Sequence, residues 1–174
     1  MFKKRSVAKR QRGLAPIWSA ETRVLVLGSF PGIASLAAGR YYAHPRTHFW
    51  PRMGELLRLP LPAMTYEQRV HALAGAGVGL WDTIVACRRE GSLDGAIRDP
   101  VWGDPAAAMA AAPRLALVCF NGKTAARALP RWRDAGLATL ALPSTSPAYT
   151  LPLATKLEAW RAAVRPLQTI GRKR

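Results

Sequence analysis

The sequence of 174 residues predicts an α/β fold with a mainly parallel sheet. Four short apolar runs have the length and composition of buried strands, and stretches with apolar residues at helical spacing lie between them. Strands that alternate with helices are typical of parallel sheets. The length suits one domain with a full hydrophobic core. We therefore expect a single domain over residues 15–168, a flexible basic arm at residues 1–14 and a basic tail at residues 169–174.

The most informative stretch of the chain is residues 23–50. Residues 23–27 are the first expected strand, because they form an apolar run that ends at a glycine. The turn Gly28-Ser29-Phe30-Pro31-Gly32 follows, and its glycines and proline force a tight bend whose amides can face a ligand. Aromatic, basic and hydroxyl residues are then crowded into residues 41–50. So many of these residues together indicate a functional site.

Two helices and a second strand are expected next. Apolar residues at helical spacing predict a helix over residues 49–58, which two prolines terminate. The helix over residues 65–74 has Thr65 as its cap and Gln68 three residues later, the pattern of a capping box. The second strand covers residues 77–81 and ends at Asp82. We expect a long loop over residues 88–105, because this segment is rich in charge, glycine and aspartate.

The second half of the domain repeats the alternation. An alanine-rich helix at residues 105–112 leads into the third expected strand at residues 115–120, and the turn at residues 121–123 opens a helix to about residue 129. The fourth strand, residues 138–142, runs into a segment rich in proline, serine and threonine. A final amphipathic helix covers residues 153–164.

Polar turns follow all four expected strands. They contain residues 28–32, Asp82, residues 121–123 and residues 144–146. In a parallel sheet, every strand-to-helix turn lies at the carboxyl edge, where ligands bind. We therefore expect these four turns to form a single pocket.

The charge of the chain favours a polyanionic partner. Lys and Arg number 26 against 10 Asp and Glu, a net charge of +16, and removing the nine basic residues of the two ends still leaves +7. Nucleic acid is the partner that such a charge favours most. The basic N-terminal segment suits an arm that holds DNA, with a nuclear or organellar address as the alternative. We expect a cytoplasmic protein of bacterial type and no membrane partner, since no apolar run reaches the roughly 20 residues of a membrane span.

Neither cysteine indicates a metal site. Cys87 and Cys119 are far apart in apolar surroundings, which favours buried free thiols in a reducing compartment. Two cysteines are too few for an iron–sulfur cluster, and no spacing of Cys and His suits zinc. We expect no metal.

Asn121 is the most informative polar residue of the expected pocket. Its carboxamide offers a donor beside an acceptor, which complements the carbonyl and ring N–H of uracil or hypoxanthine. A helix cap is the structural alternative. Asp82 suits an acceptor for a base N–H, or alternatively a cap or an ion pair with Arg88 or Arg89.

The remaining candidates fall into three groups. Tyr41, Tyr42 and Phe49 suit base stacking, with Phe49 preferred. His44 suits either a site residue that holds water or an anionic leaving group, or a buried histidine. The residues assigned to the base beside them are Gly28, Ser29 and Phe30. The residues assigned to DNA phosphates are Pro31, Gly32, Lys123, Ser144, Thr145 and Ser146.

Five motifs carry a family resemblance. GSFPG, YYAHPRTHFW, LWDTIVACRREGSLD, FNGK and PSTSPA, in this order and spacing, resemble the uracil-DNA glycosylase superfamily, most closely its hypoxanthine-DNA glycosylase branch, over residues 22–165. The resemblance implies a three-layer α/β/α sandwich with a central four-stranded sheet. It also implies that a deaminated base is flipped out of DNA and removed by hydrolysis, with no cofactor and no lyase step. The expected partner is DNA that contains a deaminated base, and we expect a monomer.

Two positions depart from the family pattern. Phe30 stands where the mismatch-specific branch has a residue that positions water, and Thr47 stands where the hypoxanthine branch has an Asn; the branch's other functional Asn is retained as Asn121. Thr47 is then the first candidate to hold the water, with Asp82 and His44 as alternatives. The missing amides leave a rival hypothesis, a module that binds damaged DNA without cleaving it. An enzyme of free nucleosides fits the large positive charge less well.

Overall fold

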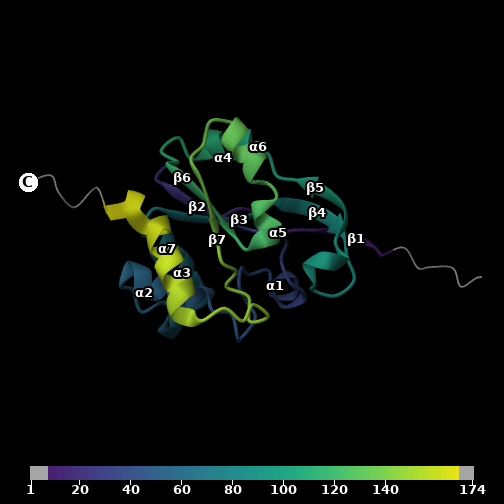
Figure 1. Ribbon diagram of the computed structural model, residues 1–174, viewed down its shortest axis with the longest axis horizontal. Coiled ribbons are helices and arrows are strands. Elements are labelled where there is room, and N and C mark those ends of the chain that lie inside the picture. Colours follow the sequence, from purple (N-terminus) through teal and green to yellow (C-terminus); the bar gives the residue numbers. More distant parts are fainter. Residues whose placement is uncertain (1–7, 169–174) are drawn as a thin grey trace, which may run out of the picture.

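The structure of the protein, a computed structural model, describes residues 8–168, and a four-stranded parallel sheet forms its centre (Figure 1). The strand order is β3-β2-β6-β7. The strands are β2 (Val24–Gly28), β3 (Val78–Asp82), β6 (Leu117–Asn121) and β7 (Thr139–Leu142). All four lie where the sequence predicts them, and the predicted α/β class with its parallel sheet is confirmed.

Both faces of this sheet are covered, because alternate side chains of each strand point to opposite sides. In β2, Val24 and Val26 pack against one group of helices, while Leu25 and Leu27 pack against the other. The first group is α2 (Phe49–Leu57), α3 (Tyr66–Gly75) and α7 (Leu153–Gln168); the second is α4 (Pro105–Ala111), α5 (Lys123–Ala126) and α6 (Leu129–Asp134). Figure 1 shows α2, α3 and α7 together, with α4 and α6 across the sheet from them. The three-layer sandwich is confirmed.

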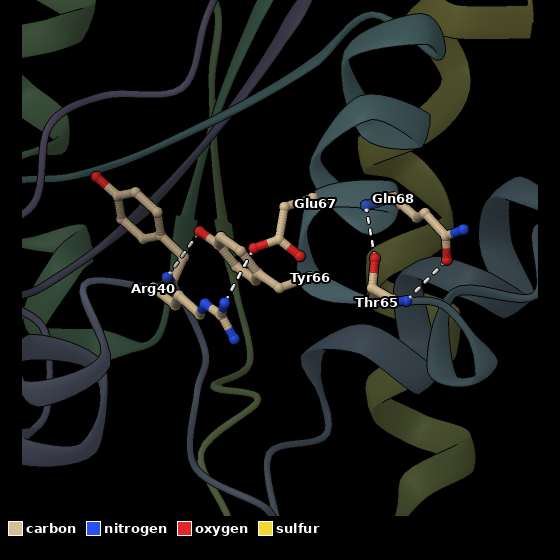
Figure 2. A network of polar contacts seen from close by, with 6 residues as sticks. Arg40, Thr65, Tyr66, Glu67 and Gln68 are labelled. Carbon is tan, nitrogen blue, oxygen red and sulfur yellow. Dashed lines mark hydrogen bonds and ion pairs between the residues drawn. The ribbon is translucent and has the colours of Figure 1, made fainter.

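The start of α3 anchors the aromatic segment that leads into the site. Thr65 Oγ1 accepts a hydrogen bond from the Gln68 amide at 3.2 Å, and Gln68 Oε1 accepts one from the Thr65 amide at 2.9 Å (Figure 2), so the predicted capping box is confirmed. In the same turn, the Tyr66 hydroxyl accepts from the Tyr41 amide at 3.0 Å. Arg40 pairs with Glu67 at 2.9 Å. These contacts hold the chain immediately before Tyr42.

A second, antiparallel sheet corrects two predictions. Its order is β1-β4-β5, with β1 (Arg10–Arg12), β4 (Ile84–Arg88) and β5 (Arg98–Trp102). The expected loop over residues 88–105 is therefore wrong, since it contains β5 and the short 3-10 helix η2 (Asp94–Ala96). The expected free arm is also wrong for Arg10–Arg12, which pair with β4. Residues 1–7 of that arm and the basic tail at residues 169–174 lie outside the described residues.

Other differences are local. The helix α1 (Ile33–Ala38) and the 3-10 helix η1 (Leu61–Ala63) were not expected, and the helix after residue 121 is divided into α5 and α6. The last helix extends four residues beyond its expected end and contains Pro166 in its final turn. Both cysteines are buried free thiols, as predicted. Within residues 8–168, no helix has both the length and the apolar character needed to cross a membrane.

Candidate active site

The turns that follow the parallel strands meet in one cavity of about 460 Å³ at the carboxyl edge of the sheet. The predicted residues that line it are Gly28, Ser29, Phe30, Pro31, Gly32, Tyr42, His44, Thr47, Asp82, Asn121, Ser144, Thr145 and Ser146. The turns after β2, β3, β6 and β7 all contribute. The structure therefore brings together side chains that the sequence places far apart, as the sheet topology predicts.

Asp82 supplies a buried carboxylate to this cavity. It is the last residue of β3 and lies opposite Gly28 in the sheet. The side chain is only 6% exposed, and its Oδ2 has no hydrogen-bond partner among residues 8–168. A Cβ at position 28 would lie 2.5 Å from Asp82 Oδ1 and 3.9 Å from the Tyr42 hydroxyl. Glycine at position 28 is therefore needed to leave room for the carboxylate.

The surroundings of Asp82 change its acidity. Burial and the negative charge of Asp94 raise the pKa of Asp82, Arg89 lowers it, and together these effects place the pKa at about 7. Desolvation is the largest of these effects. At neutral pH, the carboxyl group therefore exists in both charged and neutral forms. A group with a pKa near the working pH is suited to general acid–base chemistry.

Asn121 joins the end of β6 to Tyr42 and to the loop at residues 144–146 by hydrogen bonds. Its Nδ2 donates to the Tyr42 hydroxyl at 3.1 Å and to Thr145 Oγ1 at 2.8 Å, while its Oδ1 accepts from the Thr145 amide at 2.9 Å. Both amide hydrogens are thus used within the protein. Asn121 lines the cavity, but the predicted donor–acceptor pair facing a base is absent from this arrangement. Nor does Asn121 cap α5, whose cap is Gly122.

Of the pair Tyr42 and Phe49, only Tyr42 lines the cavity, alongside the aromatic residues Phe30, Tyr41 and Tyr149. The two rings are stacked with centroids 3.7 Å apart and an interplanar angle of 11°. Phe49 is 0% exposed and is packed edge-on against Trp160 in the core, so the preference for Phe49 as the stacking residue is wrong. Tyr42 has φ +52°, and its carbonyl accepts from Trp50 Nε1 at 3.0 Å. The Tyr42 ring is therefore held in place from behind by Phe49.

His44 and Thr47 lie at the mouth of the cavity. His44 is exposed, which excludes the buried-histidine alternative, and its Nδ1 accepts from the Arg46 amide at 3.1 Å. Thr47 Oγ1 accepts from the Phe49 amide at 3.3 Å, at the first residue of α2. The Thr47 hydroxyl is therefore already used in part to satisfy the start of this helix.

The expected phosphate-binding residues differ in where they lie and in how exposed they are. Ser144 and Ser146 lie at the rim, where each Oγ accepts from the amide two residues later, at 3.1 Å and 3.3 Å. Thr145 is buried through its contacts with Asn121. Lys123 is exposed at the start of α5 and does not line the cavity. The lysine is thus the one predicted phosphate residue outside this group.

One wall of the cavity was not predicted. Ser92, Leu93 and Asp94 line it, from the segment that was expected to be a long loop. Ser29 Oγ donates to Asp94 Oδ1 at 2.7 Å, and the Ile33 amide donates to Ser92 Oγ at 2.9 Å. These bonds join residues 92–94 to the glycine turn. The GSLD letters in the third sequence motif were the only signal that could have placed this segment at the site.

Arg89 packs against the turn at residues 28–32. Its guanidinium lies 4.9 Å from the Phe30 ring centroid and donates to the Pro31 carbonyl. The side chain is 2% exposed. Among residues 8–168, no group of three or more His, Cys, Asp or Glu side chains is arranged to hold a metal ion. The cavity is lined by carboxylates, aromatic rings and hydroxyl groups.

Known proteins are similar to this chain in sequence and in fold. The family model of the uracil DNA glycosylase superfamily matches residues 16–168. Relatives named hypoxanthine DNA glycosylase from Methanosarcina barkeri and Methanosarcina acetivorans are each 34% identical, with alignments that cover 90% and 89% of this chain and 99% and 98% of the relatives. The solution NMR structure of a Methanosarcina acetivorans protein, provisionally assigned as a uracil DNA glycosylase, matches with a TM-score of 0.83 at 34% identity, covering 91% of this chain and 99% of that one.

Proposed function

Because this chain belongs to the uracil DNA glycosylase superfamily, we propose that it excises deaminated bases, uracil or hypoxanthine, from DNA by hydrolysing the bond between base and sugar. The observation that carries the proposal is the cavity at the carboxyl edge, where Tyr42 and the buried Asp82 line one space. Its volume of about 460 Å³ falls within the range of about 300–1,000 Å³ that is usual for ligand sites. The net charge of +16 supports a DNA substrate.

The target base must leave the duplex to reach Asp82, because this residue is buried and lines the cavity. Flipping costs a few kcal/mol of unstacking. Stacking on an aromatic ring recovers about 1–3 kcal/mol per base, and we assign this role to Tyr42. Asn121 holds the Tyr42 hydroxyl and the loop at residues 144–146 in fixed relation. We therefore assign Asn121 to positioning the ring and the rim against which the DNA strand lies.

Asp82 is the residue to which we assign positioning of the attacking water. As the base departs, the sugar becomes positively charged and the base carries away the bonding electrons. A carboxylate stabilises that cation and accepts the proton of the water. The side chain of Phe30 has no polar atom. Thr47 Oγ1 already accepts a hydrogen bond from the Phe49 amide, and Asp94 Oδ1 accepts one from Ser29 Oγ. Asp82 also lines the cavity, and its Oδ2 has no hydrogen-bond partner in the described chain.

His44 is suited to the departing base. Since its Nδ1 accepts a hydrogen bond from Arg46, a neutral imidazole carries its proton on Nε2. We assign this N–H as a donor to the negative charge that develops on the base. The chain is further proposed to act as a monomer in the cytoplasm, bound to nucleoid DNA.

A single-turnover assay tests the proposal. Duplexes that carry uracil, hypoxanthine or xanthine at one position are incubated with excess protein and then treated with alkali, and the free base is quantified. We expect alkali-labile breaks at uracil or hypoxanthine and an equal amount of released base. Tight binding with an intact strand would contradict the proposal and would identify a non-cleaving damage-recognition protein.

Gly28→Ala is expected to lower the single-turnover rate by about 100-fold, the cost of a small misplacement of a reacting group. The new Cβ would lie 2.5 Å from Asp82 Oδ1, so the carboxylate must move. Gly75→Ala is the matched control, because no atom lies within 4 Å of a Cβ at that position. Equal rates for the two variants would show that the position of Asp82 does not matter for excision.

Tyr42→Ala is expected to weaken binding of lesion-containing DNA by about 5- to 150-fold, which corresponds to the loss of about 1–3 kcal/mol of stacking. Tyr42→Phe keeps the ring but removes the hydroxyl that accepts from Asn121. We therefore expect Tyr42→Phe to bind lesion DNA nearly as well as the wild type. Fluorescence anisotropy with lesion and undamaged duplexes measures both. A loss that is the same for undamaged DNA would contradict the stacking role.

A further inference from the structure

Two buried cations of the protein do not line the candidate active site. Arg52 of α2 and Lys156 of α7 are 2% and 1% exposed. Among residues 8–168, neither forms an ion pair with a carboxylate. All three guanidinium nitrogens of Arg52 lack a hydrogen-bond partner in the same part of the chain. Lys156 Nζ donates to the Tyr149 carbonyl and lies 4.8 Å from the Tyr149 ring centroid. A buried charge without a partner is costly, so this arrangement calls for an explanation.

Both cations line one cavity of about 480 Å³. It lies between α2, the first turns of α7 and the loop at residues 147–151, and Figure 1 shows the two helices side by side. His48 also lines this cavity, and its Nδ1 is buried with no hydrogen-bond partner in the described chain. Glu55 is the only carboxylate among the lining residues, and its side chain is exposed. The walls therefore present the guanidinium of Arg52, which has no acceptor in the described chain, and the ammonium of Lys156, which donates to the Tyr149 carbonyl.

The electrostatics of the two groups are consistent with an anion site. Burial lowers the pKa of Arg52, which Glu55 partly opposes. Burial also lowers the pKa of Lys156, and the positive charge of Arg52 lowers it further. The two side chains therefore repel each other in the free protein. A guanidinium and an ammonium together suit phosphate, since Arg can bind two of its oxygens at once.

We propose that Arg52 and Lys156 form a phosphate-binding site, and that its ligand is a backbone phosphate of the DNA strand whose base enters the neighbouring cavity. Pro147 and Tyr149 line both cavities, so the two spaces share one short loop as a wall. The Thr145 carbonyl accepts from the His48 amide at 3.1 Å and joins this loop to the start of α2. A strand that crosses the loop thus brings a base to one cavity and a phosphate to the other. The choice of DNA as the ligand rests on the proposed function.

The test compares Arg52→Met and Lys156→Met with Arg165→Met, which removes one exposed positive charge from α7. Binding of a duplex with a stable abasic analogue is measured over a range of salt concentrations. Each site variant is expected to weaken binding about 10-fold and to reduce the slope of log affinity against log salt by about 0.9, the contribution of one phosphate contact. The slope for Arg165→Met is expected to be that of the wild type. Slopes of both site variants equal to that of the control would overturn the DNA assignment.

Thermal unfolding provides a second readout that does not depend on glycosylase activity. Inorganic phosphate is compared with chloride at equal ionic strength. Phosphate is expected to raise the Tm of the wild type and not that of Arg52→Met, and without phosphate Arg52→Met is expected to unfold at a higher Tm than the wild type, because it no longer buries a lone charge. A lower Tm for both site variants in chloride, with no response of the wild type to phosphate, would overturn the site and assign the two cations to packing. A phosphate response with unchanged DNA slopes would show a free-phosphate site and overturn the backbone contact.

Discussion

Asp82→Asn is expected to lower the single-turnover rate of base excision by about 10²- to 10⁴-fold, the usual contribution of a positioned acid–base group. The amide has nearly the same shape as the carboxyl group, so the cavity keeps its form. It carries no negative charge to stabilise the sugar cation and cannot accept the proton of the water. Release of free base from a uracil or hypoxanthine duplex measures the effect. Wild-type rates in this variant would remove Asp82 from the mechanism.

The pH dependence of excision follows from the same residue. Because burial raises the pKa of Asp82 to about 7, the carboxylate that the reaction needs is the minor form in mildly acidic solution. The wild-type rate is therefore expected to rise with pH through about 7 and to level off only when the carboxyl group is fully ionised. The residual rate of Asp82→Asn is expected to lack this step. A wild-type rate that falls as pH increases through 7 would contradict the role of the carboxylate as acceptor.

The stability of the folded protein is expected to fall as pH rises, whereas the excision rate rises. The pKa of Asp82 is higher in the folded chain than its ordinary value of 3.8, so its favourable contribution is present in acid and is lost as pH rises from about 4 to about 7. Asp82→Asn removes the buried charge and is expected to raise the Tm at pH 8 more than at pH 4. Such a variant would be more stable and less active, the trade-off that functional sites often show. Thermal unfolding at the two pH values measures it.

Asn121→Ala is the second change with a large expected effect. It removes three hydrogen bonds, which join β6 to Tyr42 and to Thr145. Each such bond contributes about 0.5–1.5 kcal/mol to stability, so we expect a Tm lower by several degrees. The excision rate is expected to fall by about 100-fold, since the stacking ring and the serine loop lose their fixed relation.

A double-mutant cycle with Thr145→Val separates this positioning role from direct contact with the base. Thr145→Val removes the hydroxyl that accepts from Asn121. If Asn121 acts through the loop, the two substitutions share one interaction and their effects on the rate are less than additive. Additive losses would show that Asn121 contributes through a contact of its own, as its sequence motif first suggested.

The parallel sheet was predictable because its strands stand out as apolar runs, and β2, β3 and β6 are largely buried. The strand β5 was not, since its first four residues are exposed and include Asp99 and Pro100. The strand β1 consists of Arg10, Gln11 and Arg12 and exists only through its pairing with β4. Nothing local in either segment predicts a strand. The hydrogen bonds come from a partner distant in the sequence.

The candidate site was predictable to the level of its turns and not to the level of its contacts. Sheet topology placed residues 28–32, Asp82 and Asn121 together. It could not show which of Tyr42 and Phe49 faces the cavity, because both are aromatic and only the position of α2 buries one behind the other. Arg52 and Lys156 are separated by 104 positions, and their shared burial is a property of helix packing alone.

The structure of a complex with lesion-containing DNA is the most direct test of the roles assigned to Tyr42 and Asp82. A duplex that carries 2′-fluoro-2′-deoxyuridine resists hydrolysis, because fluorine disfavours the positive charge that develops on the sugar, and it holds the substrate before reaction. We expect the uracil to lie out of the helix, against the ring of Tyr42, with its sugar next to Asp82. A base that stays stacked in the duplex, or that occupies another part of the surface, would contradict the central claim.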